Sequence, residues 1–207
     1  YNSSICTNCA KNYVEGLNWL LSNGKDKTII DRKGKPKNQL IYSNRKNFGS
    51  DTAMIYWTRE NESIDDINLL DNPDVGEIDE LINSVARGNT QPKLGIKTDQ
   101  FYSCTLSGAA ARISIRDWIE VSLGDIRYNI AEWFKDIAII AYGEIRYPSL
   151  YVLARAGCNK KSKNDPTNAR IATHLWNSAL KNSVPPLWIL TSVLKSIRFI
   201  ENTEDGR

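Results

Sequence analysis

A chain of 207 residues with 41% hydrophobic and 25% charged residues has the composition of a globular protein that can bury a core without disulfides. It contains no run of about 18 consecutive apolar residues, so we expect no helix that spans a membrane. The net charge of +3 is uneven, because residues 1–50 sum to +6 and residues 51–90 to −8. A basic segment followed by an acidic one predicts charged surface patches that face different partners. The alternative is that both segments are solvated surfaces whose opposite charges cancel.

Hydrophobic periodicity and turn residues predict the elements of the first half of the chain. They are a helix over 13–21 ended by Asn23-Gly24, a polar loop over 25–47 with a short strand near 40–42, a buried strand over 52–57, an acidic connection over 60–74, a helix over 75–85 closed by Gly88, and a loop over 89–99. Residues 1–98 therefore read as a helix, a strand and an acidic connection.

The second half begins with the clearest pair of strands and continues in helices. The predicted elements are strands over 101–106 and 111–121, a helix over 123–137, a helix from Pro148 to about Ala156, a basic loop over 157–167, and helices over 171–180 and 187–200 separated by Pro185-Pro186. Residues 99–207 thus form a β-hairpin followed by helices. The expected fold is α+β, helix-rich, with a small antiparallel sheet whose hairpin lies at about 100–121.

Known catalytic motifs are missing from the sequence. It has no G-x-x-x-x-G-K-[ST] phosphate loop and no G-x-S-x-G elbow. Acidic residues are numerous between Asp65 and Glu80, but they lie in a polar connection and at the start of a helix, where carboxylates favour the helix dipole. We therefore expect a protein that is not an enzyme and uses no cofactor. A metal-dependent nuclease is the alternative that these carboxylates leave open.

The four cysteines include one C-x-x-C pair, Cys6 and Cys9. No second pair accompanies them, and the single histidine, His174, lies in an apolar helical stretch. Because a structural zinc site usually needs four ligands, we expect no bound metal and free thiols in a reducing cytosol.

The second strand of the hairpin carries groups that suit nucleic-acid binding. Alternation along a strand puts four polar or aromatic residues on one side: Arg112, Ser114, Arg116 and Trp118. Three isoleucines would point to the other side and anchor the strand on the helix over 123–137: Ile113, Ile115 and Ile119.

Each residue type on the first face has a known use on nucleic acids. Guanidinium groups contact phosphates in pairs of hydrogen bonds, and an indole stacks on a base. The basic loop adds Lys160, Lys161 and Lys163. The alternative is a solvated sheet face on which Arg116 pairs with a neighbouring carboxylate.

The hairpin segment 101–118, FYSCTLSGAAARISIRDW, resembles the signature of the large-subunit family of type I-C CRISPR Cascade complexes, F-Y-I-L-x-L-S-P-N-A-A-R-L-S-V-R-F-W. The positions that match are Leu106, Ser107, Ala110, Ala111, Arg112, Ser114, Arg116 and Trp118. Gly108-Ala109 replaces the family's Pro-Asn, and Asp117 replaces its Phe.

Further segments are similar to the family in the same order along the chain. They are YVEGLNWLL at 13–21, SDTAMIYWT at 50–58, the segment 129–137, which resembles the family's N-I-x-x-x-x-D-L helix, the segment 147–153 and the helical part over 175–198. The resemblance implies a fragment from the middle of the subunit. A preceding region that helps to recognise the protospacer-adjacent motif and a following helical bundle would then be missing.

The resemblance also implies a function, since in RNA-guided effectors the guide RNA reads sequence while protein holds the backbone and a short motif. The chain would be a non-catalytic, cytoplasmic component of a ribonucleoprotein complex in antiviral defence, binding DNA and RNA. Its implied partners are the CRISPR RNA, the target DNA, the other Cascade subunits and a helicase-nuclease recruited after target binding. The alternative interpretation is a general protein-interaction module with basic loops.

Overall fold

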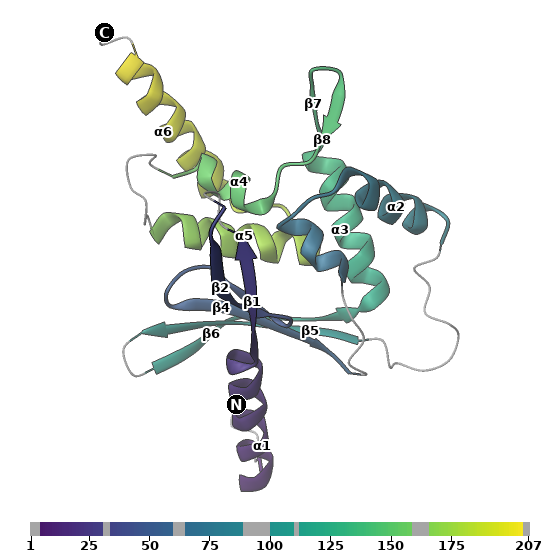
Figure 1. Ribbon diagram of the computed structural model, residues 1–207, viewed down its shortest axis with the longest axis vertical. Coiled ribbons are helices and arrows are strands. Elements are labelled where there is room, and N and C mark those ends of the chain that lie inside the picture. Colours follow the sequence, from purple (N-terminus) through teal and green to yellow (C-terminus); the bar gives the residue numbers. More distant parts are fainter. Residues whose placement is uncertain are drawn as a thin grey trace.

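A four-stranded antiparallel sheet divides the molecule into two unequal sides (Figure 1). The computed structural model describes residues 5–30, 34–59, 65–88, 100–109, 112–158 and 166–204. The strands are β3 (Arg45–Asn47), β4 (Thr52–Thr58), β5 (Gln100–Ala109) and β6 (Arg112–Ser122), in the order β3-β4-β5-β6. The segments 1–98 and 99–207 thus contribute two strands each, and the predicted α+β fold is confirmed.

The larger side of the sheet is covered by helices and contains the main core (Figure 1). These elements are the 3-10 helix η1 (Asp65–Leu70), α2 (Val75–Ala86), α3 (Leu123–Ile137), α4 (Leu150–Ala156), α5 (Pro166–Lys181) and α6 (Leu187–Glu204). Phe101 from β5, Phe134 from α3 and Leu180 from α5 are fully buried together with Ile126 and Ile130. Ile126, Ile130 and Phe134 follow one another at intervals of four residues along α3, which is the helical spacing that the sequence analysis used to predict this helix.

The smaller side holds α1 (Thr7–Ser22), one end of which meets the sheet while the rest projects away from it (Figure 1). Leu17, Leu20 and Leu21 pack on a second cluster that includes Ile55 and Leu106. No described residue of α1 is itself buried, so this helix covers the sheet only in part. The helix ends at Asn23, as predicted.

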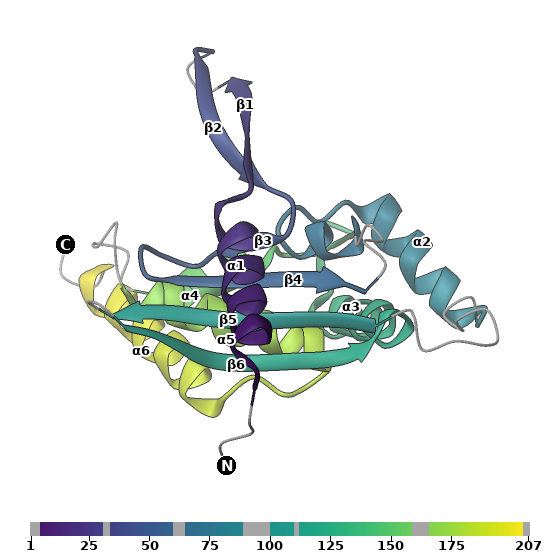
Figure 2. The same ribbon diagram turned by 90° about the horizontal axis from the view of Figure 1, so that it is seen from below.

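Two small hairpins extend from this body, and the sequence analysis predicted neither. β1 (Gly24–Ile30) pairs with β2 (Pro36–Tyr42) and projects past the β3 edge of the sheet in Figure 2. β7 (Ile139–Ala141) pairs with β8 (Glu144–Arg146). The prediction of a polar loop over 25–47 was wrong, except for its strand near 40–42. Pairing across a hairpin forms strands in a segment whose composition of Lys, Gly and Asn is typical of loops.

The other predicted elements are confirmed, and most differ from the prediction by a few residues at their ends. β4, the β5–β6 pair, α2, α3 and α6 lie where periodicity placed them, whereas α1 begins six residues before the predicted start at residue 13 and α5 five residues before the predicted start at residue 171. Gly88 closes α2 with a φ of 74°, a conformation that favours glycine. The acidic connection contains η1, whose Ile67, Leu69 and Leu70 are buried. The predicted loop over 89–99 lies outside the described residues, and within the described part no helix is long and apolar enough to cross a membrane.

Candidate nucleic-acid interface

The predicted row of side chains on β6 is interrupted by a β-bulge at Arg116. Thr105 of β5 pairs with Asp117, but the next residue, Leu106, pairs with Ile115. Arg116 is therefore an extra residue without a partner across the strands. A bulge of this kind reverses the alternation of side chains beyond it.

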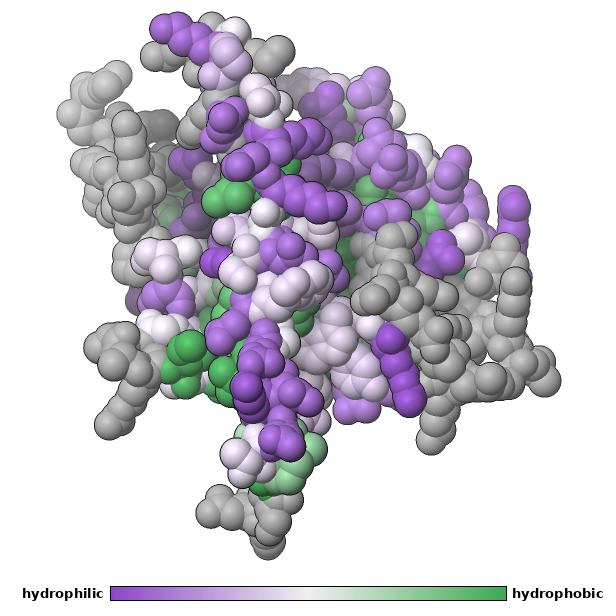
Figure 3. All heavy atoms as spheres, turned by 60° about the horizontal axis from the view of Figure 1, so that its bottom comes forward, coloured by the Kyte–Doolittle hydropathy of each residue, from purple (hydrophilic) through white to green (hydrophobic). Residues whose placement is uncertain are grey.

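The bulge places Trp118 on the α1 side of the sheet. Its ring lies 5.6 Å from that of Trp57 and 6.3 Å from that of Tyr102. Ile113 and Ile115 are on this side as well and are 68% and 66% exposed. In a space-filling view from below the sheet, hydrophilic and hydrophobic residues both reach the surface (Figure 3).

Two face predictions were therefore wrong. Trp118 does not share a face with Arg116, and of the three isoleucines only Ile119, which is 3% exposed, packs into the core beneath the helices. The prediction assumed that side chains alternate between the two faces along the whole of β6. The extra residue at Arg116 breaks this alternation, so the residues before and after it do not follow one pattern.

Arg116 and Ser114 lie on the helix side. Ser114 pairs with Ser107 of β5, and the Arg116 Nε donates a hydrogen bond of 2.6 Å to the Ser107 Oγ. The carboxylate beside Arg116 in sequence is occupied elsewhere, because the Asp117 Oδ1 lies 2.5 Å from the Lys181 Nζ. Within the described residues no carboxylate forms an ion pair with Arg116, so its charge is not neutralised locally.

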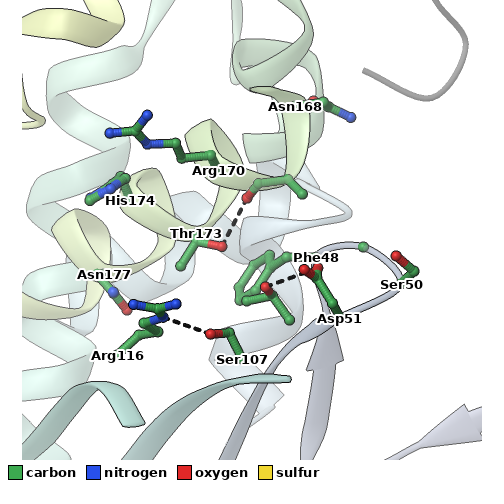
Figure 4. A pocket seen from close by; sticks show the side chains of 13 residues that line it. Phe48, Ser50, Asp51, Ser107, Arg116, Asn168, Arg170, Thr173, His174 and Asn177 are labelled. Atoms are coloured by element: carbon green, nitrogen blue, oxygen red, sulfur yellow. Dashed lines mark hydrogen bonds between the residues drawn. The ribbon is translucent and has the colours of Figure 1, made fainter. Parts of the chain in front are cut away.

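Arg116 lines a hollow of about 910 Å³ between the sheet and α5 (Figure 4). Ser107 and Arg116 come from the β5–β6 pair, and the turn 48–52 between β3 and β4 forms a second wall. That turn passes close to α5, because a Cβ added at Gly49 would lie 3.1 Å from the Ala169 Cβ. A residue larger than glycine at this position would push the turn and the helix apart.

α5 supplies the polar wall of the hollow. Arg170, His174 and Asn177 are spaced by four and three residues, so they lie on one face of the helix. The Arg170 guanidinium lies 4.5 Å above the Trp188 ring, and the His174 ring lies 5.4 Å from the same ring. Burial, and secondarily the charge of Arg170, lowers the pKa of His174, although Asp117 opposes the shift. His174 is therefore mainly uncharged near neutral pH.

The structure joins only part of the predicted site. Ser114 and Arg116 are on the side of the hollow and Trp118 on the opposite side, while the side chain of Arg112 and all of Lys160, Lys161 and Lys163 lie outside the described residues. The sequence analysis missed the α5 wall and the turn 48–52. Three polar residues at helical spacing could have indicated the wall, but no local signal places the turn beside it.

The acidic run between Asp65 and Glu80 has structural partners along its length. The Arg127 Nε lies 2.9 Å from the Asp66 Oδ2, Lys46 pairs with Asp71, and Asp74 caps the N-terminus of α2. These contacts tie η1 and α2 to neighbouring elements. Within the described residues no three His, Cys, Asp or Glu side chains gather as potential metal ligands.

Cys6 and Cys9 lie at the exposed N-terminus of α1. The Cys6 Sγ accepts the backbone N–H of Cys9 as the helix cap, and the two sulfurs are 2.8 Å apart. The hydrogen bonds from Cys9 lower the pKa of Cys6, and the hydrogen bond to Cys6 raises the pKa of Cys9. Cys104 and Cys158 are buried thiols.

One family model covers nearly the whole chain. It is that of CRISPR-associated protein (Cas_Csd1), and it matches residues 1–204. The match includes all three segments that meet at the hollow: the turn 48–52, the β5–β6 pair and α5. No curated protein matches the sequence.

Proposed function

Because the chain belongs to the CRISPR-associated protein (Cas_Csd1) family, we propose that it is a non-catalytic part of the large subunit of a type I-C RNA-guided surveillance complex. Its task there is to bind nucleic acid, to help recognise target DNA and to hold the complex together in antiviral defence. The proposed partners are the CRISPR RNA, the target DNA, the other Cascade subunits and the helicase-nuclease recruited after target binding, in the cytoplasm.

The main support for the nucleic-acid role is that the charge of Arg116 is available to a ligand. Its guanidinium faces a hollow, bonds a neutral hydroxyl through Nε and has no ion-pair partner in the described part of the chain. An arginine held in this way keeps its terminal N–H groups for an incoming anion, and phosphate is one of the two anions, with carboxylate, whose geometry matches its forked donor.

Exposed apolar surface supports the assembly role. α6 leaves the body at one end (Figure 1), and four apolar residues at helical spacing are at least 45% exposed along it: Leu187, Leu190, Leu194 and Ile197. An apolar stripe of this kind is typical of a surface that another protein covers. It also favours the second candidate function, a protein-interaction module that binds no nucleic acid.

The absence of catalysis is part of the proposal. The contacts of Asp66, Asp71 and Asp74 support it, because each carboxylate has a structural role in holding η1 or α2. A nuclease would instead need carboxylates that converge on a metal ion.

Co-purification tests the assembly role. The chain should be recovered with the backbone subunits and guide RNA when these are expressed together. A shift assay with single-stranded and duplex DNA then separates the two candidate functions, since an interaction module joins the subunits but shifts neither DNA.

A salt titration tests the arginines. Replacing Arg112 and Arg116 together by Ala should weaken binding and reduce the slope of log affinity against log salt by roughly 0.7 to 0.9 for each phosphate that the protein no longer neutralises. Arg87→Ala, at the end of α2, is the matched control for removal of one exposed arginine. An unchanged slope with a lowered melting temperature would show that the two arginines are structural.

A further inference from the structure

The β7–β8 hairpin is anchored to the body only at its two ends. Ile137, before β7, and Tyr147, after β8, pack against the main core, and the Tyr147 ring lies 5.6 Å from that of Phe134. Among the described residues, none of those over 138–146 belongs to either hydrophobic cluster. The hairpin therefore stands free of the body, beyond the end of α3 (Figure 1).

The free part of the hairpin carries apolar side chains that nothing in the body covers. Ile140 of β7 lies opposite Ile145 of β8, and the two are 83% and 52% exposed. Ile139 is 50% exposed, and Tyr142 at the tip is 97% exposed. Because an isolated two-stranded hairpin is only marginally stable in water, these side chains gain little there. A group of exposed apolar residues on one protruding element is typical of a surface that a partner covers.

The tip has a tyrosine where the turn favours other residues. Tyr142 and Gly143 connect the two strands, and their φ angles are 56° and 82°. Positive φ at both central residues is the conformation of a type I′ turn, in which Asn and Gly are preferred. A tyrosine is disfavoured there by the contact of its Cβ with the backbone. Local backbone energetics do not account for Tyr142, and a conformation held against them points to a use for the ring.

The surroundings of the hairpin are acidic. Asp79 of α2 accepts a hydrogen bond of 3.3 Å from the tyrosine hydroxyl that follows β8. Glu80 is next to Asp79 on α2, and Asp136 lies in the last turn of α3. These three carboxylates are exposed, and none of them forms an ion pair with another described residue. The basic residue of the hairpin, Arg146, lies 3.6 Å from the carboxylate of Glu144.

These charges favour a protein over a nucleic acid as the partner. Apolar side chains of some proteins wedge between the base steps of DNA, but carboxylates at the base of the hairpin would repel the phosphates beside the wedge. A protein surface with Lys or Arg around an apolar socket fits both features, because the socket takes the tip and the basic border faces the carboxylates. Tyrosine is also among the residues that most often anchor protein interfaces.

We infer that the β7–β8 hairpin inserts its tip into an apolar socket with a basic border on another protein of the assembled complex. Tyr142 is the anchor, Ile140 and Ile145 contact the wall of the socket, and the carboxylates of α2 and α3 face the border. The inference rests on the proposed assembly function and assigns it to a surface separate from the stripe on α6. Each partner in a standard interface buries roughly 800 Å², more than one hairpin tip provides, so the exposed side of α2 takes part.

The decisive variant is Tyr142→Asn, because asparagine suits the left-handed turn. The variant removes the ring while the hairpin keeps its turn, so the melting temperature should stay level or rise. Tyr142→Phe keeps the ring and should keep most of the affinity. Tyr13→Asn removes a tyrosine that is 68% exposed on α1, and it is the control for the loss of an exposed aromatic ring elsewhere.

The probe is the guide-RNA-loaded assembly of backbone subunits, prepared without the large subunit. Biolayer interferometry measures the affinity of the full chain for this immobilised assembly at several salt concentrations. Tyr142→Asn should weaken binding by at least about 10-fold, as the loss of an interface anchor does. Glu80→Gln and Asp136→Asn together should weaken it by roughly 2- to 10-fold at low salt and flatten its salt dependence. Glu120→Gln, at an exposed position of β6, should change neither.

The outcomes separate this inference from the function on which it rests. A wild type that does not bind the assembly refutes the proposed assembly function and the inference with it. A wild type that binds, with Tyr142→Asn binding equally well, refutes the inference alone. Titration of a labelled DNA strand and a labelled duplex should give the same affinities for Tyr142→Asn as for the wild type. A variant that loses affinity for DNA but not for the assembly would assign the hairpin to nucleic acid and overturn the inference.

Discussion

The hydrogen bond from Asn129 to Leu180 should be one of the larger single contributions to the stability of this fold. Asn129 is 8% exposed on α3, and its Nδ2 donates to the Leu180 carbonyl across 2.7 Å. That carbonyl is in the last turn of α5, where the final C=O groups lack partners within the helix. Because the Leu180 side chain is fully buried, water is a poor substitute for the amide.

The expected magnitude follows from leaving this carbonyl unpaired. Asn129→Leu keeps a similar volume but removes the donor, which costs about 1 to 3 kcal/mol for a buried acceptor. For a chain of 150–250 residues, each kcal/mol lowers the melting temperature by about 2 to 4 °C. A loss of about 2 kcal/mol should thus lower the melting temperature by about 4 to 8 °C.

Thermal and urea denaturation followed by circular dichroism measures this effect. The midpoint in urea should fall while the slope of the transition stays constant, because the buried surface hardly changes. Asn83→Leu, at an exposed position of α2, should stay within about 0.5 kcal/mol of the wild type. If the two variants melt together, Asn129 does not stabilise the end of α5.

Three further predictions concern metals, catalysis and pH. Elemental analysis should find no stoichiometric zinc; about one tightly bound zinc per chain, absent from Cys6→Ser, would contradict the prediction that Cys6 and Cys9 hold no metal. DNA and RNA incubated with the protein and Mg²⁺ or Mn²⁺ should stay intact, and cleavage abolished by changing Asp65 or Asp66 would refute the absence of nuclease activity. Burial, and then the charge of Asp71, raises the pKa of Tyr56 to about 12, above its value of about 10 in unfolded chains. Stability should therefore fall as pH rises from about 10 to 12, and urea midpoints should show a smaller fall in Tyr56→Phe.

Local patterns in the sequence were sufficient to predict the helices and the central strands of this fold. The apolar spacing of Ile126, Ile130 and Phe134 predicts α3 because a helix needs one continuous buried face, and all three are fully buried. The hydrophobic run of β4 predicts a strand covered on both sides, and helices lie on both sides of it. The hairpins β1–β2 and β7–β8 escaped prediction because their strands are stabilised by pairing and carry little apolar periodicity.

The candidate site was decided by tertiary structure. Alternation along β6 assigns Trp118 and Arg116 to one face, but the faces are set by the pairing with β5, and one inserted residue reverses them. The hollow likewise depends on the approach of the turn at Gly49 to Ala169 of α5, residues 120 positions apart in the chain. Side-chain periodicity describes one element at a time, whereas a binding site depends on the register and packing between elements, which no local pattern encodes.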